Sequence, residues 1–169
     1  IEVLVENGSR KILGLTAARM PAKGLIAARS RKKYGRRKDE RPEAMKKLFT
    51  WVRPYLATSF QLKSDQSPRY PSPFSRYLQG AKHEAFKGRR GCVVSQGELK
   101  AGGYDPLFSL NHTAAMVRDN LKTLTRRTWC TMKKPDRFQC LLNLYMIWHN
   151  SRLAGLKRPS ILWVPSTVL

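Results

Sequence analysis

The side chain best placed for chemistry in this sequence is an aspartate at the end of a predicted strand. Residues Phe60–Asp65 alternate between apolar and polar types, which predicts a β-strand, and the loop signal Gln66-Ser67-Pro68 follows at once. The end of a strand presents its side chain to solvent or to a ligand. Asp65 is therefore the first candidate functional residue.

A second group of candidates lies on one predicted helix over residues 110–127. Its apolar residues recur at helical spacing and predict a buried stripe of Leu110, Ala114, Val117, Leu121 and Leu124. At about 100° per residue, another face carries Asn111, Ala115, Arg118 and Lys122, with Arg126 at its margin. The helix thus combines a polar end group with a ladder of positive charges suited to phosphates. An ordinary surface helix of a basic protein would show the same pattern.

The elements before Asp65 begin with an antiparallel hairpin. Strand-like segments at Ile1–Glu6 and Arg10–Met20 flank Asn7-Gly8, which is typical of a two-residue hairpin turn. A short helix is expected over Leu25–Tyr34. Pro42 then opens an amphipathic helix that ends near Tyr55. Its predicted core-facing residues are Met45, Leu48, Phe49 and Val52.

The elements after Asp65 are a brief helical turn at Phe74–Leu78, a short strand at Lys82–Phe86 and a long helix at Asp136–Arg152. The stripe of that last helix consists of Phe138, Leu141, Leu142, Tyr145 and Trp148. Because further apolar residues lie on its other sides, we expect the helix to be largely buried.

Positive charge runs through the whole chain. Lys and Arg number 33 against 11 Asp and Glu, so the formal net charge is +22 on 169 residues. A positive electrostatic field of this strength favours a polyanionic partner, and nucleic acid is the usual one. The loop Lys87-Gly88-Arg89-Arg90-Gly91 suits contact with phosphates. The stretch Arg36–Arg41 is either a solvated loop or another phosphate-binding loop.

Composition also limits the class of protein. Hydrophobic residues make up 41% of the chain, which is enough for the core of one ordinary domain, and no apolar window is long enough for a membrane span. Three cysteines without a CxxC pair fit reduced thiols in a cytosol. A zinc site made from Cys92, His112, Cys130 and Cys140 is a weaker alternative, because structural zinc ligands usually come in close pairs.

Several stretches together resemble the catalytic domain of bacterial insertion-sequence transposases of the DDE (DDE/N) type. They are Ile12-Leu13-Gly14, Met20-Pro21-Ala22-Lys23-Gly24, Lys63-Ser64-Asp65, His83 to Gly91, Leu110-Asn111-His112-Thr113, Arg126 to Thr131 and His149-Asn150. The resemblance spans almost the whole chain, and the segments around Asp65 and Asn111 are its most specific parts.

The resemblance implies an RNase H-like fold, a mixed sheet flanked by helices. It implies one catalytic domain over residues 1–169, truncated at its amino terminus, in which residues 136–169 form a C-terminal helix and tail. Such domains hold two Mg²⁺ or Mn²⁺ ions with carboxylates for DNA strand cleavage and transfer. Asp65 matches the second acidic residue of the family and Asn111 the third. An amide oxygen can ligate magnesium but brings no negative charge.

The first aspartate of the family pattern has no counterpart in this sequence. It belongs on an opening strand that would precede Ile1, and Glu2 and Glu6 are substitutes in charge only, on the second strand of this register. The sequence therefore predicts a chain that keeps the fold and DNA affinity but lacks autonomous strand transfer.

The resemblance also implies partners and a location. The implied partners are the DNA of the insertion-sequence ends and of the target, together with further copies of the chain in a homo-oligomer on DNA. No membrane is expected as a partner, and the implied location is the cytoplasm, in association with the nucleoid. The predicted DNA contacts are Lys87, Arg89, Arg90, Arg118, Lys122, Arg126 and Arg127. A structural RNA-binding protein and a non-catalytic transposase relic are the rival functions. His112 is either a proton carrier or a capping group, and His83 with Glu84 lies either by the metal site or on a paired surface strand.

Overall fold

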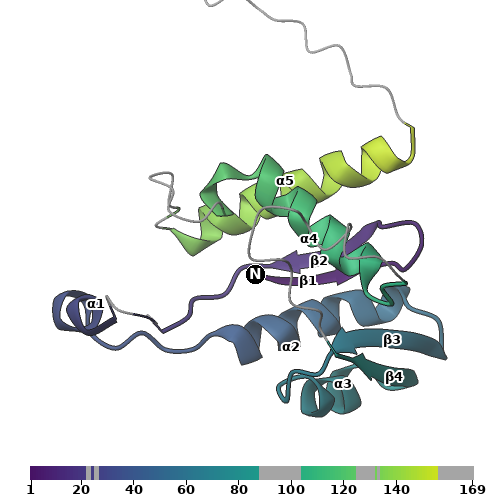
Figure 1. Cartoon of the computed structure of the whole chain (residues 1–169), viewed down its shortest axis with the longest axis horizontal. Helices are drawn as coiled ribbons and strands as arrows, with labels where there is room; N and C mark the ends of the chain where they lie inside the picture. The colour runs from purple at the N-terminus through teal and green to yellow at the C-terminus, as the bar shows by residue number, and fades with distance from the viewer. Residues whose placement is uncertain (22–23, 25–26, 88–103, 125–131, 133, 156–169) are drawn as a thin grey trace, which may run out of the picture.

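The chain contains both strands and helices, as predicted for a mixed α/β protein. The computed structural model describes residues 1–21, 24, 27–87, 104–124, 132 and 134–155. In chain order the elements are β1 (Glu2–Val5), β2 (Ile12–Thr16), α1 (Ala27–Tyr34), α2 (Arg41–Val52), η1 (Arg53–Tyr55), β3 (Phe60–Asp65), α3 (Pro71–Tyr77), β4 (Ala81–Phe86), α4 (Phe108–Asn120), η3 (Lys122–Leu124) and α5 (Pro135–Leu153) (Figure 1).

The predicted hairpin of β1 and β2 is confirmed, but its turn is longer than predicted. The strands pair antiparallel, and the Glu6 amide donates to the Lys11 carbonyl at 2.8 Å, which leaves four residues in the turn. The Ser109 hydroxyl of α4 accepts from the Gly8 amide and donates to Asn7, at 3.1 Å in both cases. This contact across 101 residues competes with the local preference for a two-residue turn.

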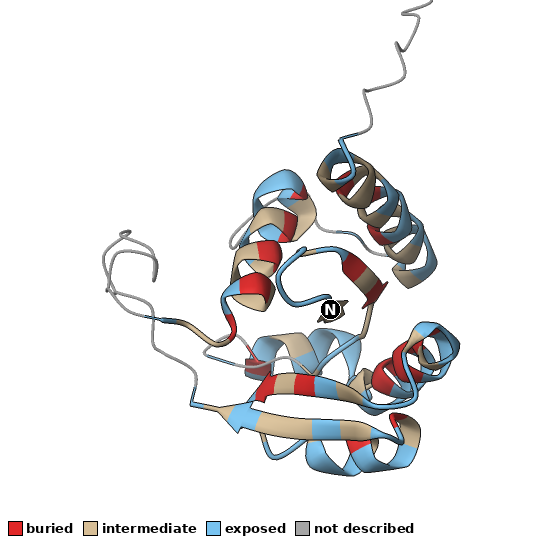
Figure 2. Cartoon of the chain, turned by 90° about the vertical axis from the view of Figure 1, so that its right-hand side faces the viewer, coloured by how far each residue is buried: buried red, intermediate tan, exposed pale blue. Residues whose placement is uncertain are grey.

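The hairpin lies between two layers of helix. On one face, Ile12 and Leu15 of β2 pack with Val117 of α4 and Leu142 of α5, all buried. On the other face, Leu4 and Leu13 pack against α2. Alternate strand residues point to opposite faces, so both faces of this small sheet contribute to a core. The register of the hairpin shifts between Leu4 and Val5, which lets Ile12 and Leu15 share one face although they are three residues apart. Figure 2 shows the buried residues on the helix faces that point inward.

The segment from β3 to β4 forms a second, parallel sheet. The two strands pair in register over their whole length, from Phe60 opposite Ala81 to Asp65 opposite Phe86, and α3 connects them. Phe74 of α3 and Leu62 of β3 pack on the core face of α2. That face consists of Met45, Leu48, Phe49 and Val52, as predicted.

Two of the helix predictions are wrong in extent or burial. The helix predicted over residues 110–127 ends at Asn120, because Leu121 adopts an extended backbone (ψ 92°). The buried side of α4 includes Ser109 and Thr113, whereas Leu110 and Ala114 are only partly buried. The long helix α5 is not largely buried.

On α5, Leu142 and Tyr145 face the core as predicted, but Leu144 is 65% and Ile147 61% exposed. Only one side of α5 meets the hairpin and α4, so its other apolar side chains face outward. None of the described helices is both long and apolar enough to cross a membrane.

Candidate functional site

A cleft of about 370 Å³ separates the two small sheets. One wall is the whole of β1 and the other is the whole of β3, while Leu48 and Phe49 of α2 and the first turn of α4 complete the lining. In the described part of the chain, β1 is hydrogen-bonded only to β2 and β3 only to β4. Each strand therefore presents an unpaired edge, and both strands line the same space.

Acidic groups gather at one end of this cleft. Burial raises the pKa of the Tyr70 hydroxyl, and the negative charges of Asp65 and Glu2 raise it further. Burial also raises the pKa of the Glu2 carboxyl. All three side chains line the cleft. Since Glu2 begins β1 and Asp65 ends β3, the two strands run in opposite directions along it.

Asp65 lies where the sequence predicted, at the exposed end of β3. Its Oδ1 accepts a hydrogen bond of 3.0 Å from the Ser67 amide, which closes the turn after the strand. The carboxylate is oriented by this turn and stays accessible to a ligand in the cleft.

Asn111 lies in the first turn of α4, and its amide is already engaged. Its Nδ2 donates to Asp105 Oδ2 at 3.0 Å, and Asp105 Oδ1 accepts from the Leu107 amide at 2.9 Å. An amide nitrogen that donates to a carboxylate leaves its oxygen free to accept or to ligate. Asp105 thus orients Asn111.

The two predicted catalytic residues lie toward opposite ends of β1 and do not belong to one hydrogen-bonded cluster. The first turn of α4 is joined to the β1–β2 turn through Ser109, whereas Asp65 is grouped with Tyr70 and Glu2 at the start of β1. Among the described residues, no group of three His, Cys, Asp or Glu side chains is placed to hold a metal ion. A metal shared by Asp65 and Asn111 stays a prediction.

The two histidines near these residues make packing contacts. His83 is 2.9 Å from the Ser64 hydroxyl and packs edge-on against Phe74, at 4.8 Å between ring centroids. His112 lies 3.4 Å from Arg10 Nη1 and packs against Phe108. Both rings have structural contacts within the fold.

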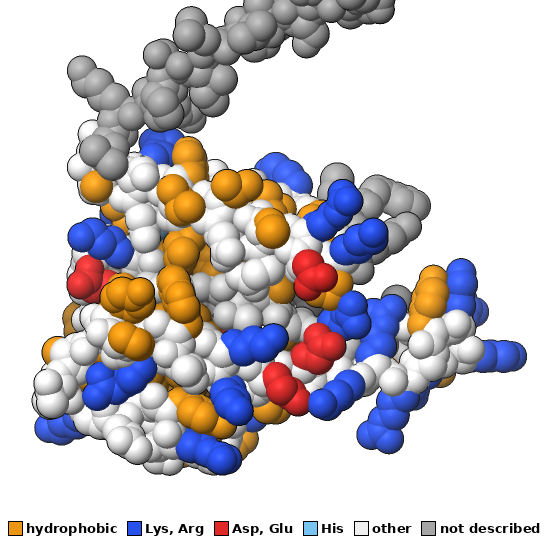
Figure 3. Space-filling view, turned by 180° about the vertical axis from the view of Figure 1, so that it is seen from behind, with side chains coloured by type: hydrophobic (Ala, Val, Ile, Leu, Met, Phe, Trp, Pro, Cys, Tyr) orange, Lys and Arg blue, Asp and Glu red, His pale blue; other side chains and the backbone are white. Residues whose placement is uncertain are grey.

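Of the predicted DNA contacts, Lys87, Arg118 and Lys122 are described and all are exposed. Lys122 lies in η3, beyond the end of α4, so the predicted continuous ladder along one helix is wrong. Arg89, Arg90, Arg126 and Arg127 lie outside the described residues. Figure 3 shows Lys and Arg side chains spread over the rear face and covering a projecting arm.

Sequence reasoning did not assign a function to Asp105 or Tyr70. Asp105 precedes its helix by three residues and carried no periodic signal. Tyr70 lies in a Pro-rich turn, where an aromatic residue is easily taken for simple packing. Tyr70 is recognised only once β1 and β3 are brought to the same cleft, and Asp105 only through its hydrogen bond to Asn111.

Comparison of this chain with protein-family models, with curated proteins and with solved structures found no match.

Proposed function

We propose that this chain is the DNA-binding catalytic domain of an insertion-sequence transposase with an RNase H-like fold, and that residues 1–169 alone bind DNA without cutting it. The observation that carries the proposal is the cleft between β1 and β3, which are lined up along it and have no strand partner on that side among the described residues.

A single additional strand fits the chemistry of this cleft. Unpaired edges present backbone N–H and C=O groups that bind another strand readily. The flanking side chains, including Leu4, Leu48, Phe60 and Leu110, are apolar and would cover both faces of an inserted strand. A strand here would join the two small sheets in the order β2, β1, new strand, β3, β4. That is the mixed sheet which the resemblance implies.

The direction of such a strand bears on the missing aspartate. A strand antiparallel to β1 is parallel to β3, because β1 and β3 run in opposite directions. Its carboxyl end would reach the end of the cleft where Asp65 and Glu2 lie. A carboxylate carried there would add a further oxygen ligand beside Asp65.

The described residues do not form a complete metal site. Mg²⁺ prefers oxygen ligands, and Asp65 offers an accessible carboxylate and Asn111 an amide oxygen. The Asn111 amide is held by Asp105, and no third ligand of the described chain joins Asp65. Bound magnesium would stabilise the negative charge of a reacting phosphodiester, but this donor set is too small to support it alone.

Two measurements on the 169-residue chain test the proposal. The first is binding to duplex DNA as a function of salt, where we expect affinity to fall steeply as salt rises because phosphate contacts release counterions. The second is cleavage of duplex DNA with magnesium, where we expect none. Preference for structured RNA over duplex DNA in competition would contradict the proposed partner, and robust cleavage would contradict the incomplete site.

A further inference from the structure

A basic arm projects from the body between β2 and α2. It comprises residues 27–38, that is, α1 and the four residues that follow it (Figure 1). Seven of the ten residues from Arg29 to Lys38 are cationic and none is acidic. Every residue from Arg31 to Lys38 is exposed.

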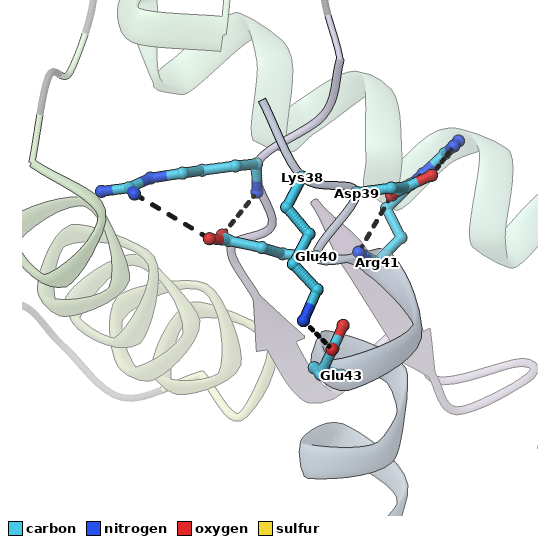
Figure 4. A network of polar contacts seen from close by, with 6 residues as sticks. Lys38, Asp39, Glu40, Arg41 and Glu43 are labelled. Atoms are coloured by element: carbon cyan, nitrogen blue, oxygen red, sulfur yellow. Dashed lines mark hydrogen bonds and ion pairs between the residues drawn. The ribbon is translucent and has the colours of Figure 1, made fainter. Parts of the chain in front are cut away.

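Three acidic residues, Asp39, Glu40 and Glu43, lie at the root of the arm, where it joins α2. The Glu40 amide donates to the Arg19 carbonyl at 3.1 Å, and the Glu40 carboxylate accepts from the Arg19 amide at 3.2 Å. Asp39 forms an ion pair with Arg41, and Lys38 is paired with Glu43 at 2.8 Å. Figure 4 shows these contacts together at the start of α2.

Among the described residues, the other cations of the arm form none of these ion pairs. The described part of the chain contains three ion pairs, and Lys38 is the only cation of the arm that takes part in one. Figure 3 agrees, since acidic side chains appear near the base of the projecting arm and not along it. The arm therefore concentrates uncompensated positive charge away from the body, and an external anion would relieve that repulsion.

Three arginines of the arm lie around one hollow. The hollow has a volume of about 410 Å³ and is lined by Ser30, Arg31, Gly35, Arg36 and Arg37 of the arm, together with Pro21, which precedes it. Gly35 has a positive φ of 71°, which turns the chain back after α1 and brings Arg36 and Arg37 beside Arg31.

An exposed aromatic ring contacts Arg37 and one further cation, Lys33. Lys33 Nζ lies 5.3 Å and Arg37 Cζ 5.5 Å from the centroid of the Tyr34 ring. Tyr34 itself is 61% exposed. The electrons of the ring attract each cation and so help to position both on the arm.

We infer that the basic arm is a phosphate-binding element that contacts the backbone of duplex DNA, with Arg31, Arg36 and Arg37 forming its anion site. Guanidinium groups bind phosphate oxygens through paired hydrogen bonds, and the Ser30 hydroxyl adds another donor. The inference rests on the proposed DNA binding for its partner but not on strand cleavage.

A membrane surface fits the arm less well than DNA does. Interfacial helices need a broad apolar face alongside their positive charge. The sequence of α1 is Ala-Ala-Arg-Ser-Arg-Lys-Lys-Tyr, in which Tyr34 is the only large ring or apolar side chain. The arm offers charge without an apolar face, which is the pattern of a phosphate-backbone contact.

The test compares two triple variants that remove the same charge. One is Arg31→Ala with Arg36→Ala and Arg37→Ala. The matched control is Lys11→Ala with Lys46→Ala and Lys82→Ala, three exposed cations on other elements. Each is titrated with duplex DNA over a range of salt concentrations, with circular dichroism and urea unfolding to verify the fold.

We expect the slope of log affinity against log salt to be shallower by about two to three units in the arm variant, since each lost phosphate contact removes about 0.9. The control should change the slope by clearly less. If the wild-type chain binds duplex and both variants share one slope, the inference fails while the proposed DNA binding stands. If the wild-type chain does not bind duplex, or binds anionic vesicles more tightly, both fail.

Discussion

The side-chain amide of Asn150 pairs with the backbone of Ile12 as a neighbouring strand would. Ile12 N donates to Asn150 Oδ1 and Asn150 Nδ2 donates to Ile12 O, both at 2.9 Å. Further along the same edge, Gln139 accepts from the Ala17 amide and donates to the Leu15 carbonyl, also at 2.9 Å. Two amides of α5 therefore close the outer edge of β2 in place of another strand. The edge of β1 that faces the cleft has no such cover in the described part of the chain.

Replacing Asn150 with alanine should destabilise the fold. It leaves the N–H and C=O of Ile12 without their partners at a site where Ile12 is buried. We expect the free energy of unfolding to fall by roughly 1–3 kcal/mol, the usual cost of unsatisfied buried groups. Urea unfolding measures this. The matched control is Gln79→Ala, which removes an amide side chain that is exposed in the turn before β4. A cost no larger than that of the control would contradict the edge-closing function.

Adding a methyl group at Gly14 should force α2 away from the hairpin. A Cβ there would overlap Leu48 Cδ1 and come within 3.1 Å of Val52 Cγ2. We expect Gly14→Ala to lower the free energy of unfolding by about 1–3 kcal/mol through overpacking. Leu48→Ala creates space at the same point, so the double variant should cost less than the sum of the single variants. Additive costs in urea unfolding would show that the contact does not limit the packing.

Periodicity was sufficient to predict the elements that make local contacts. The four apolar residues of the α2 stripe are all buried, and the predicted bounds of β3 match the observed ones. The hairpin of β1 and β2 was equally clear from alternation around Asn7-Gly8. These features depend on neighbours within a few residues, which is the range over which sequence patterns are informative.

What the sequence did not reveal depends on contacts between distant segments. Asn150 and Ile12 are 138 residues apart, and Ser109 changes the hairpin turn from 101 residues away. The end of α4 at Asn120 was missed because Leu121 and Leu124 continue the helical spacing while the backbone does not. Leu144 and Ile147 are exposed since α5 has a core partner on one side only. Which side of α5 faces solvent is decided by how the layers pack against one another, and the spacing of apolar residues in the sequence does not show this.

Glu2 should make the stability of the fold depend on pH. Burial raises the pKa of its carboxyl in the folded state above the ordinary value of 4.5. The folded chain therefore holds this proton more tightly, so the contribution of Glu2 is fully favourable below about pH 4.5 and is lost as pH rises through the folded pKa. We expect Glu2→Gln to be more stable than wild type at neutral pH and equal to it in acid. Urea unfolding at several pH values decides this, and a constant difference between the two proteins would contradict it.

Arg118 and Lys122 should contribute to DNA binding without determining its sequence preference. Both side chains are exposed, and neither takes part in an ion pair of the described chain. The Arg118 Nε donates a hydrogen bond to the Ala114 carbonyl of its own helix. Alanine at both positions should weaken binding to all duplexes alike and reduce the salt slope by at most about two units. Arg76→Ala with Lys82→Ala is the control of equal charge. A slope that matches this control would remove the α4 surface from the interface.

A strand engineered onto the amino terminus should fill the cleft and stabilise the protein. Ile1 stands at the start of β1, so an Asn-Gly turn placed before it would fold a preceding segment back along the free edge of β1, between β1 and β3. An extension of alternating Val and Thr should gain main-chain bonds to both strands and bury apolar surface against Leu4, Phe60 and Leu110. An equally long Gly-Ser extension is the control, because it supplies chain without strand preference. We expect a higher urea midpoint and slower amide exchange in β1 and β3 for the Val-Thr extension alone. If both extensions leave the midpoint at the wild-type value, the cleft does not accept a strand, and the mixed sheet proposed for this domain loses its main support.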